Sequence, residues 1–185
     1  MTTANTTIID ALRERLSGRP GKALVLSLAC EALADAALLD ALCQFMYRAE
    51  EPLRWRAVWV LGKVSERQAS LLVGERSRIM REAMQPSTPV GVRRLLLGIY
   101  SHISDGAEFD VEFFNFLLDE MVSLQSPPGV QALAMKLAAR MSCVDEALHE
   151  EFCCIVQNME LDYYSAGVRS VARRCMKTNK KKSRI

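Results

Sequence analysis

The stretch Leu53-Arg54-Trp55-Arg56-Ala57-Val58-Trp59-Val60-Leu61-Gly62-Lys63-Val64 contains both tryptophans of the chain. Apart from three basic residues, it is apolar almost all the way round a helix. A helix that is apolar on nearly every side packs between neighbouring helices rather than on the surface of a protein. We therefore expect this stretch to be an inner helix, which the rest of the chain covers with further helices.

The outline of this stretch recurs along the chain. The tripeptides Gly91-Val92-Arg93, Gly129-Val130-Gln131 and Gly167-Val168-Arg169 follow one another at intervals of 38 residues, and Arg54-Trp55-Arg56 precedes the first by 37. Prolines begin four of the five units, at Pro20, Pro52, Pro89 and Pro127. Proline suits the first turn of a helix, where its missing N–H costs nothing. A period of 32 to 38 residues is typical of a repeat protein in which each unit is one supersecondary element.

Each repeat unit has the pattern of two helices. After each start, apolar residues recur three or four positions apart, as in Val92, Leu95, Ile99 and Ile103, which indicates an amphipathic helix. Between these second helices lie first helices with apolar stripes of their own, and turn-forming residues separate the two kinds. No segment shows the sustained alternation of a half-buried strand. The chain is therefore predicted to be all-α, with ten helices in five pairs.

The starts of the second helices resemble those of a known repeat family. Val92-Arg93-Arg94 and the Trp55–Gly62 segment are similar to the second helix of a HEAT repeat, in which a valine–arginine start leads into an apolar run that ends near a glycine. The resemblance covers residues 8–177 and implies a single domain, a right-handed α–α superhelix (solenoid) of about five HEAT-like or armadillo-like helix pairs. Residues 1–7 and the basic tail 178–185 are expected to be frayed or disordered. Gly62 is expected to allow a close helix approach.

Composition narrows the classes of function. Half of the 185 residues are apolar, and the formal net charge is only +2. The sequence shows neither a secretion signal nor a run of about 18 apolar residues that would span a membrane, so we expect a cytoplasmic protein without membrane contact. Its six cysteines lack metal-binding spacing and are expected to be reduced, buried thiols. With two isolated histidines and no phosphate-binding loop, the sequence favours a non-enzymatic protein without catalytic residues, metal or cofactor.

Charge is distributed unequally between the two kinds of helix. Four second helices, taken as residues 52–65, 89–104, 127–142 and 163–177, carry eleven basic residues and no carboxylate. The first helices near residues 105–120 and 145–162 carry acidic residues and no Lys or Arg. In solenoids of the resembled kind the second helices line the concave side, which implies a basic inner face. We predict that this face is formed by Arg54, Trp55, Arg56, Arg93, Arg94, Gln131, Lys136, Arg140, Arg169 and Arg173.

Two interpretations of this pattern stay open. In the first, the acidic side chains complement the basic ones across helix pairs, or begin first helices where the helix dipole favours them, as Asp110 and Asp145 would. In the second, the residues that are equivalent in the repeat register form a ladder that receives an anionic partner. Those residues are Arg56, Arg93, Gln131 and Arg169.

The second interpretation predicts a non-enzymatic scaffold whose basic concave face receives an acidic protein segment or another polyanion. One alternative is a nucleic-acid-binding protein similar in fold to the HEAT-like DNA-alkylation-repair glycosylases, which contact nucleic acid with tryptophans and assist bond cleavage with an aspartate. Asp105 would be the nearest candidate for that aspartate. The other alternative is a structural subunit that exposes an apolar side chain from the crowded group Phe109, Phe113, Phe114 and Phe116. The oligomeric state is left open.

Overall fold

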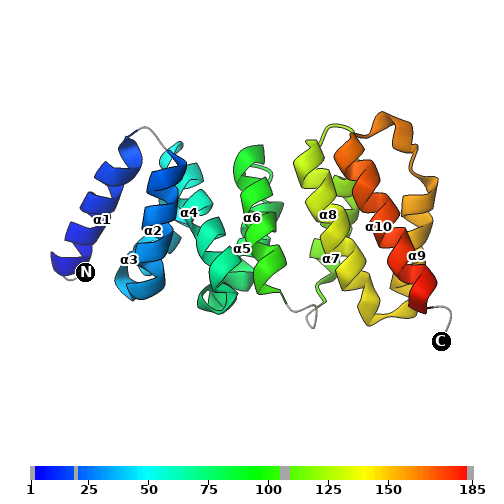
Figure 1. Cartoon of the computed structure of the whole chain (residues 1–185), viewed down its shortest axis with the longest axis horizontal. Coiled ribbons are helices and arrows are strands. Elements are labelled where there is room, and N and C mark those ends of the chain that lie inside the picture. Colours follow the sequence, from blue (N-terminus) through cyan, green and yellow to red (C-terminus); the bar gives the residue numbers. More distant parts are fainter. Residues whose placement is uncertain (1–2, 19–20, 105–108, 183–185) are drawn as a thin grey trace. The chain divides into compact units, whose positions relative to one another are not determined.

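The computed structural model of the chain describes residues 3–18, 21–104 and 109–182. Within these ranges it contains ten α-helices and three short 3₁₀ segments. The chain divides into two compact units, Met1–Ile103 and Ser104–Ile185. The first unit contains α1 to α6 and the second contains α7 to α10 (Figure 1). The prediction of an all-α chain with five helix pairs is confirmed.

The bounds of the helices follow the predicted repeat. Unit 1 consists of α1 (Thr3–Ser17), α2 (Lys22–Ala34), α3 (Ala36–Arg48), α4 (Leu53–Arg67), η1 (Ala69–Glu75), α5 (Arg76–Met84) and α6 (Val90–Ile103). Unit 2 consists of α7 (Val111–Val122), α8 (Pro128–Met141), η2 (Ser142–Val144), α9 (Glu146–Asn158), η3 (Leu161–Tyr163) and α10 (Ala166–Lys182). Helix α1 thus begins within the segment 1–7, and α10 extends into the segment 178–185, the two segments expected to be frayed or disordered.

Helix α4 is the inner helix that the opening stretch predicts. It packs against α2, α3 and α6 within unit 1. Its fully buried side chains point in several directions around the helix axis, and they are Ala57, Val58, Val60, Leu61 and Val64. Full burial of one such valine or leucine contributes about 1.5–3 kcal/mol relative to its exposure, so α4 is a main source of the stability of unit 1. Trp55 and Trp59 are half-buried, with ring centroids 5.2 Å apart.

Acidic residues begin three of the first helices as N-caps. The Asp35 carboxylate accepts hydrogen bonds from the backbone N–H groups of Ala37 and Leu38, at 2.9 and 3.2 Å. Asp110 caps α7 in the same way, and Asp145 caps α9. An N-cap carboxylate satisfies N–H groups that have no helical partner and interacts favourably with the helix dipole. This placement agrees with the first interpretation of the acidic residues.

Aromatic residues of α7 and α9 form the core of unit 2. Phe113, Phe114 and Phe152 are fully buried. Phe109 and Phe116 are half-buried, and the ring of Phe109 lies 5.2 Å from that of Phe114. None of the four crowded phenylalanines of the sequence is therefore exposed, and the expectation that one of them offers an apolar contact to a partner is not met.

Gly62 does not provide the close helix approach that the sequence led us to expect. A Cβ atom placed on Gly62 would meet no atom within 4 Å, and the same holds for Gly98 in α6. The close approach occurs at Gly91, where a Cβ would lie 3.4 Å from Nε1 of Trp55. The N-terminal turn of α6 therefore packs directly on the indole of α4.

Replacing Gly62 or Gly98 with alanine is expected to stabilise unit 1 by up to about 1 kcal/mol, because glycine in a helix interior costs this much relative to alanine. The added methyl group meets no neighbour at either position. Chemical unfolding followed by tryptophan fluorescence measures the effect, since both tryptophans lie in α4. Gly91→Ala is the matched control and should gain less, because its methyl contacts Trp55. A lower unfolding midpoint for Gly62→Ala would contradict the expectation.

Candidate functional site

The predicted ladder residues occupy equivalent places in four second helices. In each case the backbone N–H of the ladder residue donates to the carbonyl oxygen four residues earlier, at distances of 2.9–3.2 Å. The pairs are Arg56–Pro52, Arg93–Pro89, Gln131–Pro127 and Arg169–Ser165. The prolines predicted to start the repeats are therefore in register with one another in α4, α6 and α8, and Ser165 takes the same place before α10.

Two ladder residues bind the end of the first helix in their own pair. Nε of Arg93 donates to the carbonyl of Ala83, and a terminal nitrogen of its guanidinium donates to the carbonyl of Gln85, both at 3.0 Å. Nε2 of the buried Gln131 donates to the carbonyl of Ser123 at 2.8 Å. These acceptors lie at the C-terminal ends of α5 and α7, where carbonyl groups have no helical partner. The side chains therefore act as C-terminal caps.

Arg54 and Arg56 hold the ends of two other helices. Nε of Arg54 donates to the carbonyl of Met46 in the last turn of α3 at 3.0 Å, and its guanidinium forms an ion pair with Glu82 of α5. The guanidinium of Arg56 donates to the carbonyl of Leu16 in the last turn of α1. Both side chains are half-buried. These bonds join α4 to three other elements of unit 1.

Trp55 lies between these two arginines in sequence. It is half-buried between Trp59 and the start of α6, where Gly91 approaches its indole nitrogen. A tryptophan with these contacts buries much of its apolar surface against its own helix bundle. The packing thus accounts for Trp55 without a ligand.

The remaining members of the predicted set are more open. Arg94, Lys136 and Arg173 are exposed, and no hydrogen bond or ion pair joins their side chains to another described residue. Arg169 is half-buried and likewise lacks such a bond within the described part of the chain. A terminal nitrogen of the half-buried Arg140 donates to Oγ of Ser104 at 3.0 Å. Within the predicted set, the cations available to a ligand are therefore concentrated in unit 2.

Three cationic side chains line one pocket in unit 2. We call this pocket, of about 350 Å³, the basic pocket, and its lining residues are Lys136, Ala139, Arg140, Cys143, His149, Val171, Arg174 and Cys175. They come from α8, η2, α9 and α10. No carboxylate is among these lining residues. A concave site lined by one sign of charge attracts ligands of the opposite sign.

The remaining members of the basic pocket complete its wall. Nδ1 of His149 and Oγ of Ser142 form a hydrogen bond of 3.0 Å, which fixes the imidazole ring. Burial raises the pKa of the Cys175 thiol, although Arg174 and Lys136 nearby act in the opposite direction. The thiol therefore stays protonated and is a poor nucleophile. The pocket can hold an anion by charge, but the Cys175 thiol is not activated for chemistry.

The model of the HEAT repeat domain matches residues 12–179, which is nearly the whole chain. The chain belongs to the HEAT repeat family. Comparison with curated proteins and with solved structures finds no match. The HEAT match and the helix order together show an all-α solenoid of about five helix pairs, as the resemblance implied. HEAT repeats generally mediate protein interactions, through the extended surfaces that stacked helix pairs create.

Among the described residues, no group of three or more His, Cys, Asp or Glu side chains could hold a metal ion. Asp105, the aspartate considered for a glycosylase-like activity, lies outside the described residues. Within the same described ranges, no helix is long and apolar enough to cross a membrane.

Sequence reasoning assigned Lys136 and Arg140 of the HEAT domain to the binding face but omitted Arg174 and His149. Lys136 and Arg140 are four residues apart on α8, so both lie on one face of that helix. Arg174 belongs to α10, which packs against α8. The basic character of α10 was visible in the sequence, but only the packing shows that Arg174, rather than Arg173, lines the same pocket.

Proposed function

We propose that this HEAT domain is a non-enzymatic scaffold that receives an acidic protein segment on the basic side of unit 2. The observation that supports the proposal is the basic pocket, in which Lys136, Arg140 and Arg174 surround a space of about 350 Å³ without a carboxylate. Guanidinium groups bind carboxylates through paired hydrogen bonds, and the exposed Lys136 adds a mobile positive charge. A run of Asp and Glu in a partner therefore fits this site.

The other residues of the predicted basic face fall into a group that is available for binding and a group that has a structural role. Arg169 and Arg173 on α10 have side chains without a bond to another described residue, and they belong to the proposed binding surface of unit 2. Arg94 also lacks such a bond, but it lies in unit 1 and is not part of this proposal. Arg54, Arg56, Arg93 and Gln131 donate to main-chain carbonyls of their own unit. These bonds, and the packing of Trp55, support a structural role for the early part of the ladder.

The cysteines indicate the cellular compartment of the proposed scaffold. All six are free thiols, and Cys30, Cys143 and Cys154 are exposed, so the expectation of buried thiols is wrong for these three. Exposed free thiols are characteristic of proteins in a reducing compartment. We therefore place the proposed scaffold in the cytoplasm.

Binding of a labelled peptide across a salt series tests the proposal. An Asp/Glu peptide of about 12 residues should bind, and its affinity should fall as salt rises, because the attraction of exposed charges is screened over about 10 Å at 0.1 M salt. The control is a peptide of equal length with Asn and Gln in place of Asp and Glu, which should not bind. Fluorescence anisotropy reads both titrations.

A DNA duplex in the same salt series tests the alternative function. If the duplex binds more tightly than the acidic peptide, with a log–log salt slope near −0.9 for each of several phosphates, the scaffold is a nucleic-acid-binding protein and the proposal is wrong. If neither ligand binds at low salt, the basic pocket is not a binding site for polyanions. Binding of the peptide alone supports the proposal.

A further inference from the structure

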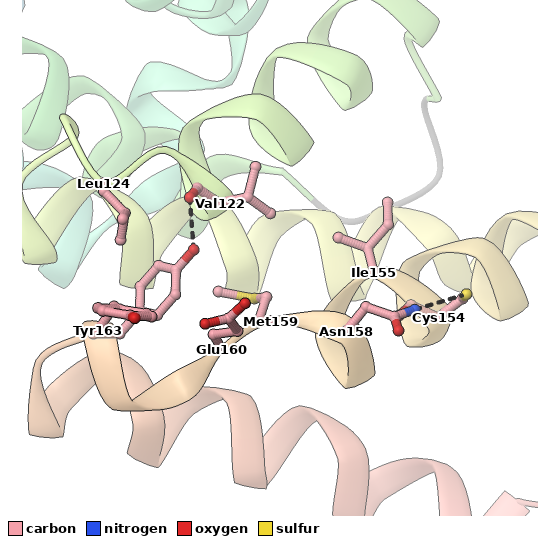
Figure 2. A pocket seen from close by; sticks show the side chains of 9 residues that line it. Val122, Leu124, Cys154, Ile155, Asn158, Met159, Glu160 and Tyr163 are labelled. Atoms are coloured by element: carbon pink, nitrogen blue, oxygen red, sulfur yellow. Dashed lines mark hydrogen bonds between the residues drawn. The ribbon is translucent and has the colours of Figure 1, made fainter.

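A second pocket of unit 2 has the opposite charge. We call it the Met159 pocket, and it has a volume of about 550 Å³. The residues that matter for its character are Val122, Leu124, Ile155, Met159, Glu160 and Tyr163. They come from the C-terminal end of α7, the turn after it, α9, the segment that leads into η3, and η3 itself. Figure 2 shows Met159 and Glu160 near the middle of the pocket, with Leu124 and Tyr163 together at one end.

Hydrogen bonds inside unit 2 hold the walls of this pocket in place. Tyr164, which also lines the pocket, donates its phenolic O–H to the carbonyl of Val122 at 2.6 Å (Figure 2). This bond ties the segment after η3 to the end of α7. At the other end, Nδ2 of Asn158 donates to the carbonyl of Cys154 at 2.8 Å. A pocket with fixed walls loses little conformational entropy when a ligand binds.

Two large apolar side chains are exposed at this one pocket. Leu124 is 59% exposed and Tyr163 is 69% exposed. A single exposed apolar residue is ordinary on a protein surface, but several that converge on one concavity mark an interaction site. Met159 and Ile155 extend the apolar surface inward. The flexible thioether of methionine adapts to partners of different shape.

The charge of the Met159 pocket selects a cationic partner. The exposed carboxylate of Glu160 lies in its wall, and no Lys, Arg or His is among the lining residues. Within the described part of the chain, no ion pair joins Glu160 to a cation. The carboxylate also affects a neighbouring side chain of the pocket. Burial raises the pKa of Tyr164, and the negative charge of Glu160 raises it further. The pocket thus combines an apolar surface with an uncompensated negative charge.

We propose that the Met159 pocket docks a peptide segment of a partner protein that presents an aliphatic side chain flanked by lysine or arginine. The aliphatic side chain enters between Ile155 and Met159, and the cation pairs with Glu160. The same cation can lie over the exposed ring of Tyr163, an arrangement that stabilises cations at aromatic faces. This site is independent of the basic pocket, which selects the opposite charge.

A selection from a display library of random peptides tests this proposal. The full chain is the bait, and a variant with Leu124→Ser and Tyr163→Ser serves for counter-selection. We expect enriched peptides to contain an aliphatic residue next to Lys or Arg. Synthetic peptides of the enriched sequence should bind Glu160→Lys about tenfold more weakly, since the reversal removes an attraction and adds a repulsion, which together are worth about 1.4 kcal/mol.

Two matched variants control for nonspecific effects. Val144→Ser removes an apolar side chain that is 48% exposed outside the pocket, and Glu14→Lys reverses an exposed charge in unit 1. Both should bind the enriched peptides like the wild type. Circular dichroism confirms that each variant is folded.

Three outcomes would overturn the proposal. The first is that no peptide is enriched over the counter-selection, or that the enriched peptides carry no excess of Lys and Arg. The second is that Glu160→Lys and Glu14→Lys lose affinity equally, which would show an effect of net charge alone. The third is that sedimentation shows a dimer of the wild type that Leu124→Ser with Tyr163→Ser abolishes, because the pocket would then be occupied by a second copy of the chain.

Discussion

Replacing Arg54 with alanine is expected to lower the free energy of unfolding of unit 1 by about 3 kcal/mol. The change removes a donor to the carbonyl of Met46 and the partner of the Glu82 carboxylate. The side chain of Arg54 is only 14% exposed and that of Glu82 only 25%. The carboxylate would therefore be left in partly dry surroundings without a counter-charge, which costs more than the loss of a surface ion pair.

Tryptophan fluorescence measures this effect in unit 1, because Trp55 and Trp59 both lie in α4. Arg94→Ala is the matched control, since this arginine is exposed and its loss should change the unfolding free energy by no more than about 0.5 kcal/mol. Arg54→Lys should lie between the wild type and Arg54→Ala. A lysine keeps the charge but cannot direct several fixed N–H groups at separate acceptors.

The stability and the peptide binding of Arg54→Ala together decide which role this arginine has. If Arg54→Ala unfolds like the wild type but weakens binding of the acidic peptide, the bonds of Arg54 are dispensable and the residue belongs to a binding surface. If Arg54→Ala destabilises unit 1 and leaves the binding unchanged, the arginine is a structural connection between α3, α4 and α5.

The architecture could be predicted from the sequence because it depends on local features that repeat. A proline at a helix start fixes the backbone, and Pro52, Pro89 and Pro127 occupy the same place in successive second helices. Apolar residues at helical spacing then determine which face is buried, as Val92 and Ile99 show. These signals depend only on residues that are close together in the chain, so a single sequence is enough to recognise them.

The role of the arginines could not be predicted in the same way. A long side chain near a helix start can reach a ligand or the carbonyl end of a neighbouring helix, and both choices use the same residue type. Arg93 and Gln131 both bind carbonyl groups at the end of a neighbouring helix, and they occupy equivalent positions in the repeat. The substitution of a neutral glutamine for an arginine was a sign of capping, because an amide donates to a carbonyl but does not replace a charge.

The sequence was also ambiguous about the role of one glycine and about the location of a 3₁₀ segment. Gly62 lies in the inner helix α4, yet open space surrounds it and the close contact occurs at Gly91. Residues Ala69–Glu75 form a 3₁₀ segment before α5, which the sequence pattern did not predict. The spacing of apolar residues in a 3₁₀ turn differs from that of an α-helix, so the periodic signal is interrupted there.

Reversing two charges of the basic pocket, Lys136→Glu with Arg174→Glu, is expected to weaken binding of the acidic peptide by about a hundredfold. Each substitution removes an attraction and adds a repulsion. The two substitutions together should therefore reduce the binding free energy by about 3 kcal/mol at this partly exposed site. Lys136 is exposed, and Nε of the exposed Arg174 makes a bond of 3.4 Å to the carbonyl of Ser170 on its own helix. The fold of unit 2 should therefore tolerate both changes.

The matched control is Lys22→Glu with Arg94→Glu, which changes the net charge by the same amount at exposed positions of unit 1. Comparison of the two variants by fluorescence anisotropy separates the basic pocket from the net charge of the protein. If both variants lose affinity equally, the peptide responds to total charge and the pocket is not its site.

A residual affinity of the Lys136→Glu and Arg174→Glu variant is also informative. Arg140 remains in the pocket, where its guanidinium is held by Ser104 at 3.0 Å. Because this cation is half-buried, a carboxylate that reaches it is screened less by salt than one at the surface. The binding that survives in the variant should therefore depend less steeply on salt than that of the wild type. A salt slope that does not change would show that Arg140 does not contact the acidic segment.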